Sequence, residues 1–173
     1  MALRKGIAYR HLERPYTRKS RVKSKGYIKT VPHTKIVKFQ MGNLQKKFSY
    51  KLALVSKENV QVRDNAIEAA RMTINRILEA KLGKNNYFFR IRVYPHHILR
   101  EHKMLTGAGA DRLQCGMKLS FGRPVGIAAQ LKEGDEIFEI GVEKNGIEIA
   151  KTAFNSIRSK LPCTTAIVSA VAG

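Results

Sequence analysis

Four groups of residues in this chain have types and spacings that enzymes or metal sites use. Gly107-x-Gly109 resembles part of a dinucleotide-binding loop, and Cys115 could act as a nucleophile beside a histidine. His96 and His97 are candidate metal ligands. The acids between positions 133 and 139 could supply paired carboxylates for acid and base catalysis.

None of these groups has the surroundings that its chemistry requires. The third glycine of the dinucleotide motif is missing, and no βαβ pattern surrounds the other two. Adjacent residues of a strand point to opposite faces, so His96 and His97 are poorly placed to share a metal ion. Nothing in the sequence orients a base toward Cys115, and the acidic stretch fits a turn and a solvated strand face. We therefore expect no catalytic residue, no metal site and no cofactor.

The basic residues give a stronger signal, because they are concentrated in one part of the chain. The first 51 residues hold fifteen Lys or Arg and one acid, so they carry +14 of the total net charge of +20. Residues 133–173, in contrast, hold six acids and four bases. Like charges oppose compaction, so such a segment indicates a polyanionic partner. Tyr9, Tyr16 and Tyr27 lie among the bases, where rings could stack on unpaired RNA bases while cations bind phosphates. Packing of these tyrosines on the domain remains the alternative.

Composition narrows the setting further. A hydrophobic fraction of 43% is enough for a folded core, and no apolar run is long enough to span a membrane. The basic segment is broken by Pro15, Gly26 and Pro32, which argues against an amphipathic helix on a membrane surface. The N-terminus lacks a signal-peptide pattern, and two cysteines are too few for a disulfide framework. We expect a cytoplasmic protein with no membrane partner.

Hydrophobic patterning predicts a basic arm over residues 1–38 and a folded domain over residues 39–173. Apolar residues at three- and four-residue steps predict two helices. Alternation of apolar and polar residues predicts the strands. The helices are expected at 63–82 and 145–160, and the strands at 48–55, 87–93, 98–100, 117–121, 125–131, 137–142 and 164–169, with shorter strand-like pieces at 27–28 and 35–39. This order predicts an α+β fold with a mixed or mainly antiparallel sheet and two principal helices packed on it.

The domain adds further candidate RNA contacts. Arg90 and Arg92 share one face of their predicted strand with Phe88 and could contact RNA; the alternative, slightly favoured, is that this is a solvated sheet face. Arg123 lies in a turn, where it could contact a phosphate. The glycine-rich loop at 102–116 is long for a compact domain, and loops of this length are usually functional or disordered.

Several motifs, in order along nearly the whole chain, resemble one protein family. They are Tyr9-Arg10 followed by residues 15–19, then residues 94–104, 108–117 and 121–126. With them the chain is similar to the archaeal and eukaryotic large-subunit ribosomal protein family called L ten-e, the counterpart of bacterial L sixteen. The chain ends without the longer C-terminal extension of eukaryotic members, so it resembles the archaeal ones.

The resemblance implies a structural, non-enzymatic protein of the large ribosomal subunit. It would bind large-subunit rRNA between the central protuberance and the peptidyl-transferase region. The small rRNA of the central protuberance and neighbouring ribosomal proteins would be further partners. The rRNA contacts implied in the arm are Arg10, Tyr16, Arg18, Lys19, Arg21, Lys23 and Lys25. The loop would approach tRNA through His102, Lys103, Met104, Gly107, Ala108, Gly109, Ala110, Asp111 and Arg112.

Two other classes of protein remain as alternatives. A free-standing nucleic-acid-binding or chromatin-type protein would have the same charge, but it would bind duplex DNA as well as structured RNA. An enzyme would have to use Cys115 or the glycine-rich loop.

Overall fold

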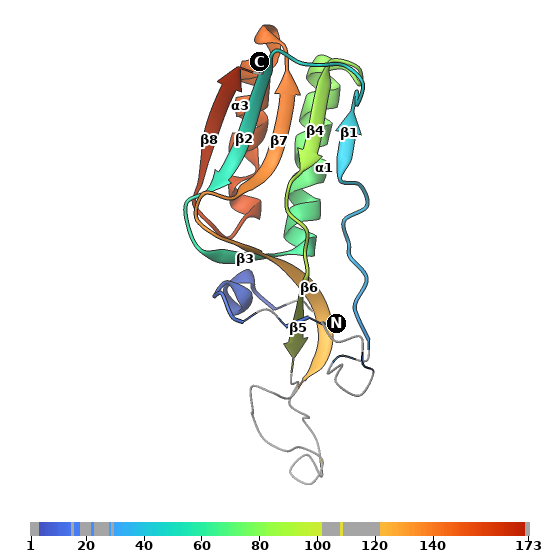
Figure 1. Cartoon of the computed structure of the whole chain (residues 1–173), viewed down its shortest axis with the longest axis vertical. Helices are drawn as coiled ribbons and strands as arrows, with labels where there is room; N and C mark the ends of the chain where they lie inside the picture. Colours follow the sequence, from blue (N-terminus) through green and yellow to red (C-terminus); the bar gives the residue numbers. More distant parts are fainter. Residues whose placement is uncertain are drawn as a thin grey trace.

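The computed structural model describes residues 4–14, 16, 17, 22, 28, 30–101, 108 and 122–171. Eight strands in this part of the chain form two antiparallel sheets (Figure 1). The larger sheet has the order β1-β4-β7-β2-β8, and the smaller has the order β3-β6-β5. The strands are β1 (Gln40–Gly42), β2 (Tyr50–Ser56), β3 (Val60–Arg63), β4 (Tyr87–Ile91), β5 (His97–Glu101), β6 (Arg123–Leu131), β7 (Glu136–Val142) and β8 (Thr165–Val171).

Two α-helices cover one face of the larger sheet, and Figure 1 shows the opposite face open. In α1 (Asp64–Leu82), the residues at three- and four-residue steps are buried, so one stripe packs on the sheet. Gly83 ends this helix with a φ of 76°, a backbone conformation that favours glycine. The second helix, α3 (Ile147–Ser156), buries Ala150, Ala153 and Phe154.

The described residues also form short 3-10 helices: η1 (Gly6–Tyr9), η3 (Lys144–Gly146) and η4 (Arg158–Lys160). In Figure 1, η1 lies beside the smaller sheet, away from the C-terminus. The main core lies between the larger sheet and the helices, and it includes the fully buried Phe89, Phe138 and Phe154. A second small cluster, Ile28, Ile98 and Ile127, packs against Tyr16 beneath the smaller sheet.

The predicted α+β class is confirmed. The helix predicted at 63–82 corresponds to α1, and the one predicted at 145–160 corresponds to η3, α3 and η4 together. The strands are divided between two sheets rather than one, and the sequence analysis missed β1 and β3. The predicted strand at 117–121 and most of the loop lie outside the described residues.

The strand predicted at 35–39 is wrong. Those residues belong to neither sheet, and they run along α1 instead. Ile36 is buried in the main core, while Lys35, Val37 and Lys38 are exposed. Side-chain carboxylates of α1 accept the N–H groups of Lys35 and Val37. A strand is bonded at the end of this segment, where the Phe39 carbonyl accepts the Ile91 N–H of β4 at 2.9 Å.

Candidate nucleic-acid interface

The N-terminal segment binds to the smaller sheet through several side chains. The Tyr9 hydroxyl donates a hydrogen bond to the Glu101 carboxylate, and Arg4 forms an ion pair with the same carboxylate at 3.4 Å. The guanidinium of Arg63 lies 5.4 Å from the centroid of the Tyr9 ring, and its Nη1 donates to the Arg4 carbonyl at 2.9 Å. These contacts attach the start of the basic segment to β3 and β5.

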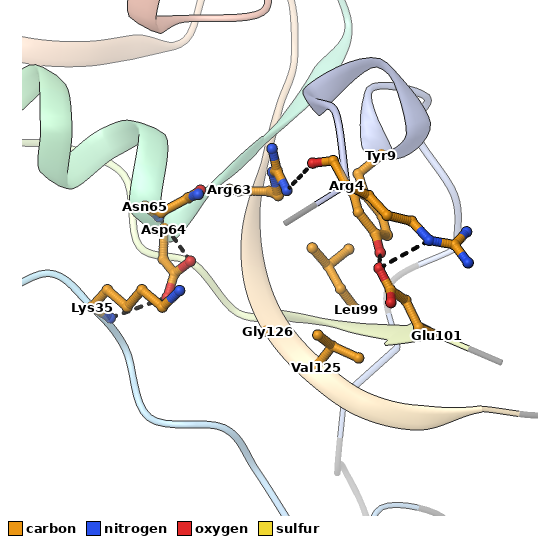
Figure 2. A pocket seen from close by; sticks show the side chains of 10 residues that line it. All are labelled: Arg4, Tyr9, Lys35, Arg63, Asp64, Asn65, Leu99, Glu101, Val125 and Gly126. Atoms are coloured by element: carbon orange, nitrogen blue, oxygen red, sulfur yellow. Dashed lines mark hydrogen bonds and ion pairs between the residues drawn. The ribbon is translucent and has the colours of Figure 1, made fainter. Parts of the chain in front are cut away.

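Figure 2 shows the pocket that these residues form with the start of α1. Arg4, Lys35 and Arg63 contribute positive charge, whereas Asp64 and Glu101 contribute negative charge. Most of these groups already have partners within the chain: Asp64 accepts from the Lys35 backbone N–H at 3.1 Å, and Glu101 pairs with Arg4. The pocket therefore lies at the contact between the N-terminal segment and the domain, and its charged groups are engaged in that contact rather than arranged for catalysis.

Arg10 is the first predicted RNA contact that the structure places. Its guanidinium binds the Glu58 carboxylate, and its side chain remains 43% exposed. Glu58 also accepts from the Thr164 hydroxyl at 2.5 Å, and this bond and Arg10 lower the pKa of Glu58. A guanidinium has five N–H donors, so Arg10 retains donors for a phosphate.

Tyr16 packs on the domain. Its ring contacts the Ile28, Ile98 and Ile127 cluster, and the guanidinium carbon of Arg100 lies 3.7 Å from the ring centroid. Its backbone N–H donates to Nδ1 of His97 at 2.8 Å, and its carbonyl accepts from the Ile98 N–H at 2.9 Å. One ring face is thus already stacked on a cation, which supports the alternative of packing on the domain for this tyrosine.

Arg90 and Arg92 differ in their surroundings although they are two residues apart. Arg90 is exposed on the open face of β4, and no side-chain partner exists for it within the described residues. Arg92 pairs with Glu136 at 3.4 Å and with Glu139 at 3.5 Å. Lys51 pairs with the same two acids at 3.5 and 3.3 Å. Arg90 is therefore the more available cation for RNA.

Arg123 begins β6 directly opposite Glu101 on β5, and it is exposed. Of the loop residues predicted near tRNA, the structure describes Ala108, which is exposed. The other loop residues, and the arm cations Arg18, Lys19, Arg21, Lys23 and Lys25, lie outside the described part of the chain. Their roles remain predictions.

The structure adds cations that the sequence analysis did not select. Lys5, Arg14, Lys35 and Lys38 are exposed and have no ion pair with any described residue. The sequence around these cations resembles the sequence around the cations that form ion pairs. Only the positions of the acids in the fold distinguish the unpaired cations from the paired ones. Arg100, stacked on Tyr16, was likewise missed because its partner lies 84 residues earlier (100 − 16).

Two described groups that could support chemistry, His97 and Cys163, are buried or half-buried. His97 is buried, and desolvation lowers its pKa, which keeps Nδ1 free to accept the Tyr16 N–H. Burial raises the pKa of the half-buried Cys163 thiol, which disfavours the nucleophilic thiolate. No cluster of three or more His, Cys, Asp or Glu suited to a metal occurs among the described residues. In the same residues, no helix is long and apolar enough to cross a membrane.

Comparison with known proteins gives a consistent result. Residues 12–168 match the family described as Ribosomal protein L16p/L10e. Several relatives bear the name large ribosomal subunit protein uL16. The protein of Archaeoglobus fulgidus is 46% identical over 97% of this chain and 93% of its own length. Those of Staphylothermus marinus and Methanococcus maripaludis are 47% and 46% identical, each over 97% of this chain and 94% of their own lengths. The chain therefore belongs to the ribosomal protein L16p/L10e family and is a structural, non-enzymatic ribosomal protein.

Proposed function

We propose that this protein is a constituent of the large ribosomal subunit that binds large-subunit rRNA near the central protuberance and the tRNA and peptidyl-transferase region. The observation that carries the proposal is the match of residues 12–168 to a ribosomal protein family, together with relatives of nearly equal length named as large-subunit proteins. Neighbouring ribosomal proteins and the small rRNA of the central protuberance are further expected partners.

The charge distribution supports RNA as the partner. Arg90 and Arg123 are exposed on the domain without an ion pair to a described residue, and Arg10 keeps part of its guanidinium exposed. Lys and Arg contacts to phosphates supply affinity that does not depend on sequence, and they position the protein on its RNA. The first 51 residues, with fifteen bases and one acid, supply most of this charge.

The position of the loop supports a role near tRNA. β5 and β6 pair in antiparallel fashion on either side of residues 102–122, which include the predicted loop, and Glu101 lies opposite Arg123 where this segment begins and ends. The N-terminal segment holds this stem through Tyr9 at Glu101 and through Tyr16 at His97 and Ile98. The segment that contains the predicted tRNA-proximal residues is therefore joined to two paired strands that the N-terminal segment contacts.

The first experiment tests RNA binding and its salt dependence. We expect tight binding to a transcript of large-subunit rRNA, with affinity falling steeply as salt rises. Arg90→Gln and Arg123→Gln should each reduce the slope of log affinity against log salt by roughly 0.7–0.9 if each removes one phosphate contact. The control is Lys151→Gln, because Lys151 is on α3 and pairs with Glu148 at 3.1 Å. Equal affinity for duplex DNA would favour a free-standing nucleic-acid-binding protein instead.

The second experiment tests the location. The protein should be found by mass spectrometry in large subunits purified at high salt, and its absence would contradict the proposal. A photo-crosslinking amino acid at Ala108, which is exposed, should label tRNA bound to those subunits. Labelling of rRNA far from the tRNA sites would contradict the tRNA assignment alone, and it would leave the subunit assignment standing.

A further inference from the structure

The larger sheet ends in a long edge strand, and no described residue is paired to its outer side. In the order β1-β4-β7-β2-β8, β8 bonds only to β2, and Figure 1 shows no element beyond it. An edge strand presents a row of unpaired N–H and C=O groups, which another polypeptide can use to add a strand. Natural proteins usually protect such edges.

The other three edges in the described chain are protected. β1 at the opposite end of the larger sheet has three residues and stops at Gly42, whose φ is 83°. On the outer side of β3, the Gln61 N–H donates to the Arg10 carbonyl at 3.1 Å. On the outer side of β5, the Ile98 N–H donates to the Tyr16 carbonyl at 2.9 Å. The exposed edge of β8 is therefore an exception within this fold.

The hydrogen-bond pattern identifies the free groups of β8. The Lys57 N–H donates to the Thr164 carbonyl at 3.0 Å, so position 164 faces β2. Because bonding alternates along an antiparallel strand, Val168 and Ala170 also bond to β2, whereas Ile167 and Ser169 direct their N–H and C=O groups outward. No hydrogen bond to these outward groups occurs among the described residues.

The sequence of β8 lacks the usual devices against pairing. Thr165-Ala166-Ile167-Val168-Ser169-Ala170-Val171 contains no charge, no proline and no glycine. Val168 is 50% exposed, and Ser169 and Ala170 are also exposed. A seven-residue strand of this composition is long enough for a stable added strand and has the β-propensity to accept one.

We propose that β8 is a docking edge to which an extended, acidic segment of another protein adds as a sixth strand. The inference rests on the proposed function in one respect, because that partner would be a neighbour in the large subunit. Regularly spaced backbone donors and acceptors fit another polypeptide backbone, and RNA cannot match them at strand spacing. A second copy of this chain is disfavoured, because two chains of net charge +20 would repel one another.

The acidic character of the partner follows from the residues at the Thr165 end of β8. Three exposed cations lie near this end and have no ion pair with a described residue. Lys57 lies beside Thr164, and Arg158 and Lys160 belong to η4, just before the strand. The nearby carboxylate of Glu58 is already bound to Arg10 and Thr164. Acidic side chains at the end of the partner segment that lies beside Thr165 would neutralise this group of cations.

The test uses intact large subunits that carry the full chain with a diazirine amino acid at Val168, whose side chain projects from the open face of the sheet beside the edge. Irradiation should join position 168 to an extended acidic segment of another protein, identified by mass spectrometry. A crosslink to rRNA only, to a second copy of this chain, or to nothing would overturn the proposal. Failure of the unsubstituted chain to enter subunits would instead contradict the proposed function.

A matched pair of substitutions tests the backbone contact. Ser169→Pro removes an outward N–H that β2 does not use, and proline is tolerated on such an edge. Ser169→Ala removes the hydroxyl and keeps the N–H. Both variants should fold and enter subunits, but Ser169→Pro should lose the crosslink from position 168 and Ser169→Ala should keep it. Equal crosslinking by the two folded variants would overturn the proposal.

Hydrogen exchange covers the case in which Ser169→Pro does not fold. In the unsubstituted protein, the amides of Ile167 and Ser169 should exchange rapidly in the free chain and at least about tenfold more slowly in the subunit. The amides of Val168 and Ala170 should be protected in both. Rapid exchange at positions 167 and 169 in the subunit would contradict strand addition.

Discussion

Asp64 and Glu68 lie one helical turn apart on α1, and their carboxylates accept the backbone N–H groups of Lys35 and Val37 at 3.1 and 3.3 Å. Four residues of an α-helix rise about 6 Å, and two residues of extended chain rise about 6.7 Å, so the two spacings nearly match. Two acids on one helix face therefore hold a segment of the basic N-terminal region by its backbone. Its lysine side chains remain exposed.

Glu68→Gln should destabilise the protein by about 2–3 kcal/mol, because it removes one half of a shielded ion pair. Glu68 receives Nε and Nη2 of Arg71 at 2.8 and 2.6 Å, and each side chain is 12% exposed. The Arg71 hydrogen bonds lower the pKa of Glu68, so the stability that this pair contributes is present near neutral pH and is lost as pH falls below about 4.5. Urea unfolding at pH 7 measures the effect.

Glu148→Gln is the control for that substitution. Glu148 and Lys151 form a pair of the same spacing on α3, but their side chains are 83% and 46% exposed. The change should cost at most about 0.5 kcal/mol, because water screens exposed pairs. Equal losses in the two variants would show that burial of the Glu68 pair does not matter.

His97 should make the protein less stable as pH falls below about 6.5. Its pKa lies below that value in the folded chain, chiefly because burial disfavours the imidazolium; His96 and Arg100 add repulsion, while Glu13 opposes the shift. The unfolded chain therefore takes up the proton first. Urea unfolding at pH 7.5 and pH 5.0 should show the loss, and His97→Asn, which keeps an acceptor for the Tyr16 N–H, should reduce it. His96→Asn should retain most of the pH dependence, because burial of His97 is the larger cause of its lowered pKa.

The elements with strong periodicity were predictable from the sequence, and their partners were not. The helix at 63–82 has a continuous apolar stripe, so its position depended on local pattern alone. The division into two sheets depends on which strands pair across long separations, such as β3 with β6, and alternation does not carry that information. β3 has only four residues, which is too short for a clear alternation, and its partner β6 lies far along the chain, so the sequence analysis missed it.

The candidate interface shows the same limit at the level of side chains. Arg90 and Arg92 have equivalent positions in the alternating pattern, yet only Arg92 meets Glu136 and Glu139, which come from β7 more than forty residues later. Charge density in the sequence predicts a polyanion partner for the region as a whole. Which cations remain available depends on where the fold places the few acids.

Gly42→Ala should strongly destabilise the larger sheet. A Cβ at position 42 would lie 2.2 Å from the Tyr87 carbonyl oxygen, and the φ of 83° is already unfavourable for alanine. Gly83 has a φ of 76° but no atom within 4 Å of an added Cβ, so Gly83→Ala isolates the backbone cost of about 1–3 kcal/mol. Gly42→Ala should exceed that loss by about 2 kcal/mol or more, because backbone must move. Similar unfolding midpoints for the two variants would contradict the close approach of β1 to β4.

Tyr16 provides a test of whether an arm tyrosine contacts RNA or packs on the domain. Its ring lies between Arg100 and the Ile28, Ile98 and Ile127 cluster, whereas no hydrogen bond of its hydroxyl to a described residue is present. Tyr16→Phe keeps the ring and should change the free energy of unfolding by less than about 0.5 kcal/mol. Tyr16→Ala removes both the packing and the stacked cation contact, and it should cost about 3 kcal/mol or more.

Binding of the same variants to large-subunit rRNA separates the two roles of Tyr16. If the ring serves mainly to anchor the N-terminal segment, Tyr16→Phe should bind rRNA as well as the unsubstituted protein does. A loss of about tenfold in affinity with Tyr16→Phe, at unchanged stability, would show that the hydroxyl contacts RNA directly. Because Arg100 covers one face of the ring, we expect the first outcome: the tyrosine holds β5, and the surrounding cations bind the phosphates.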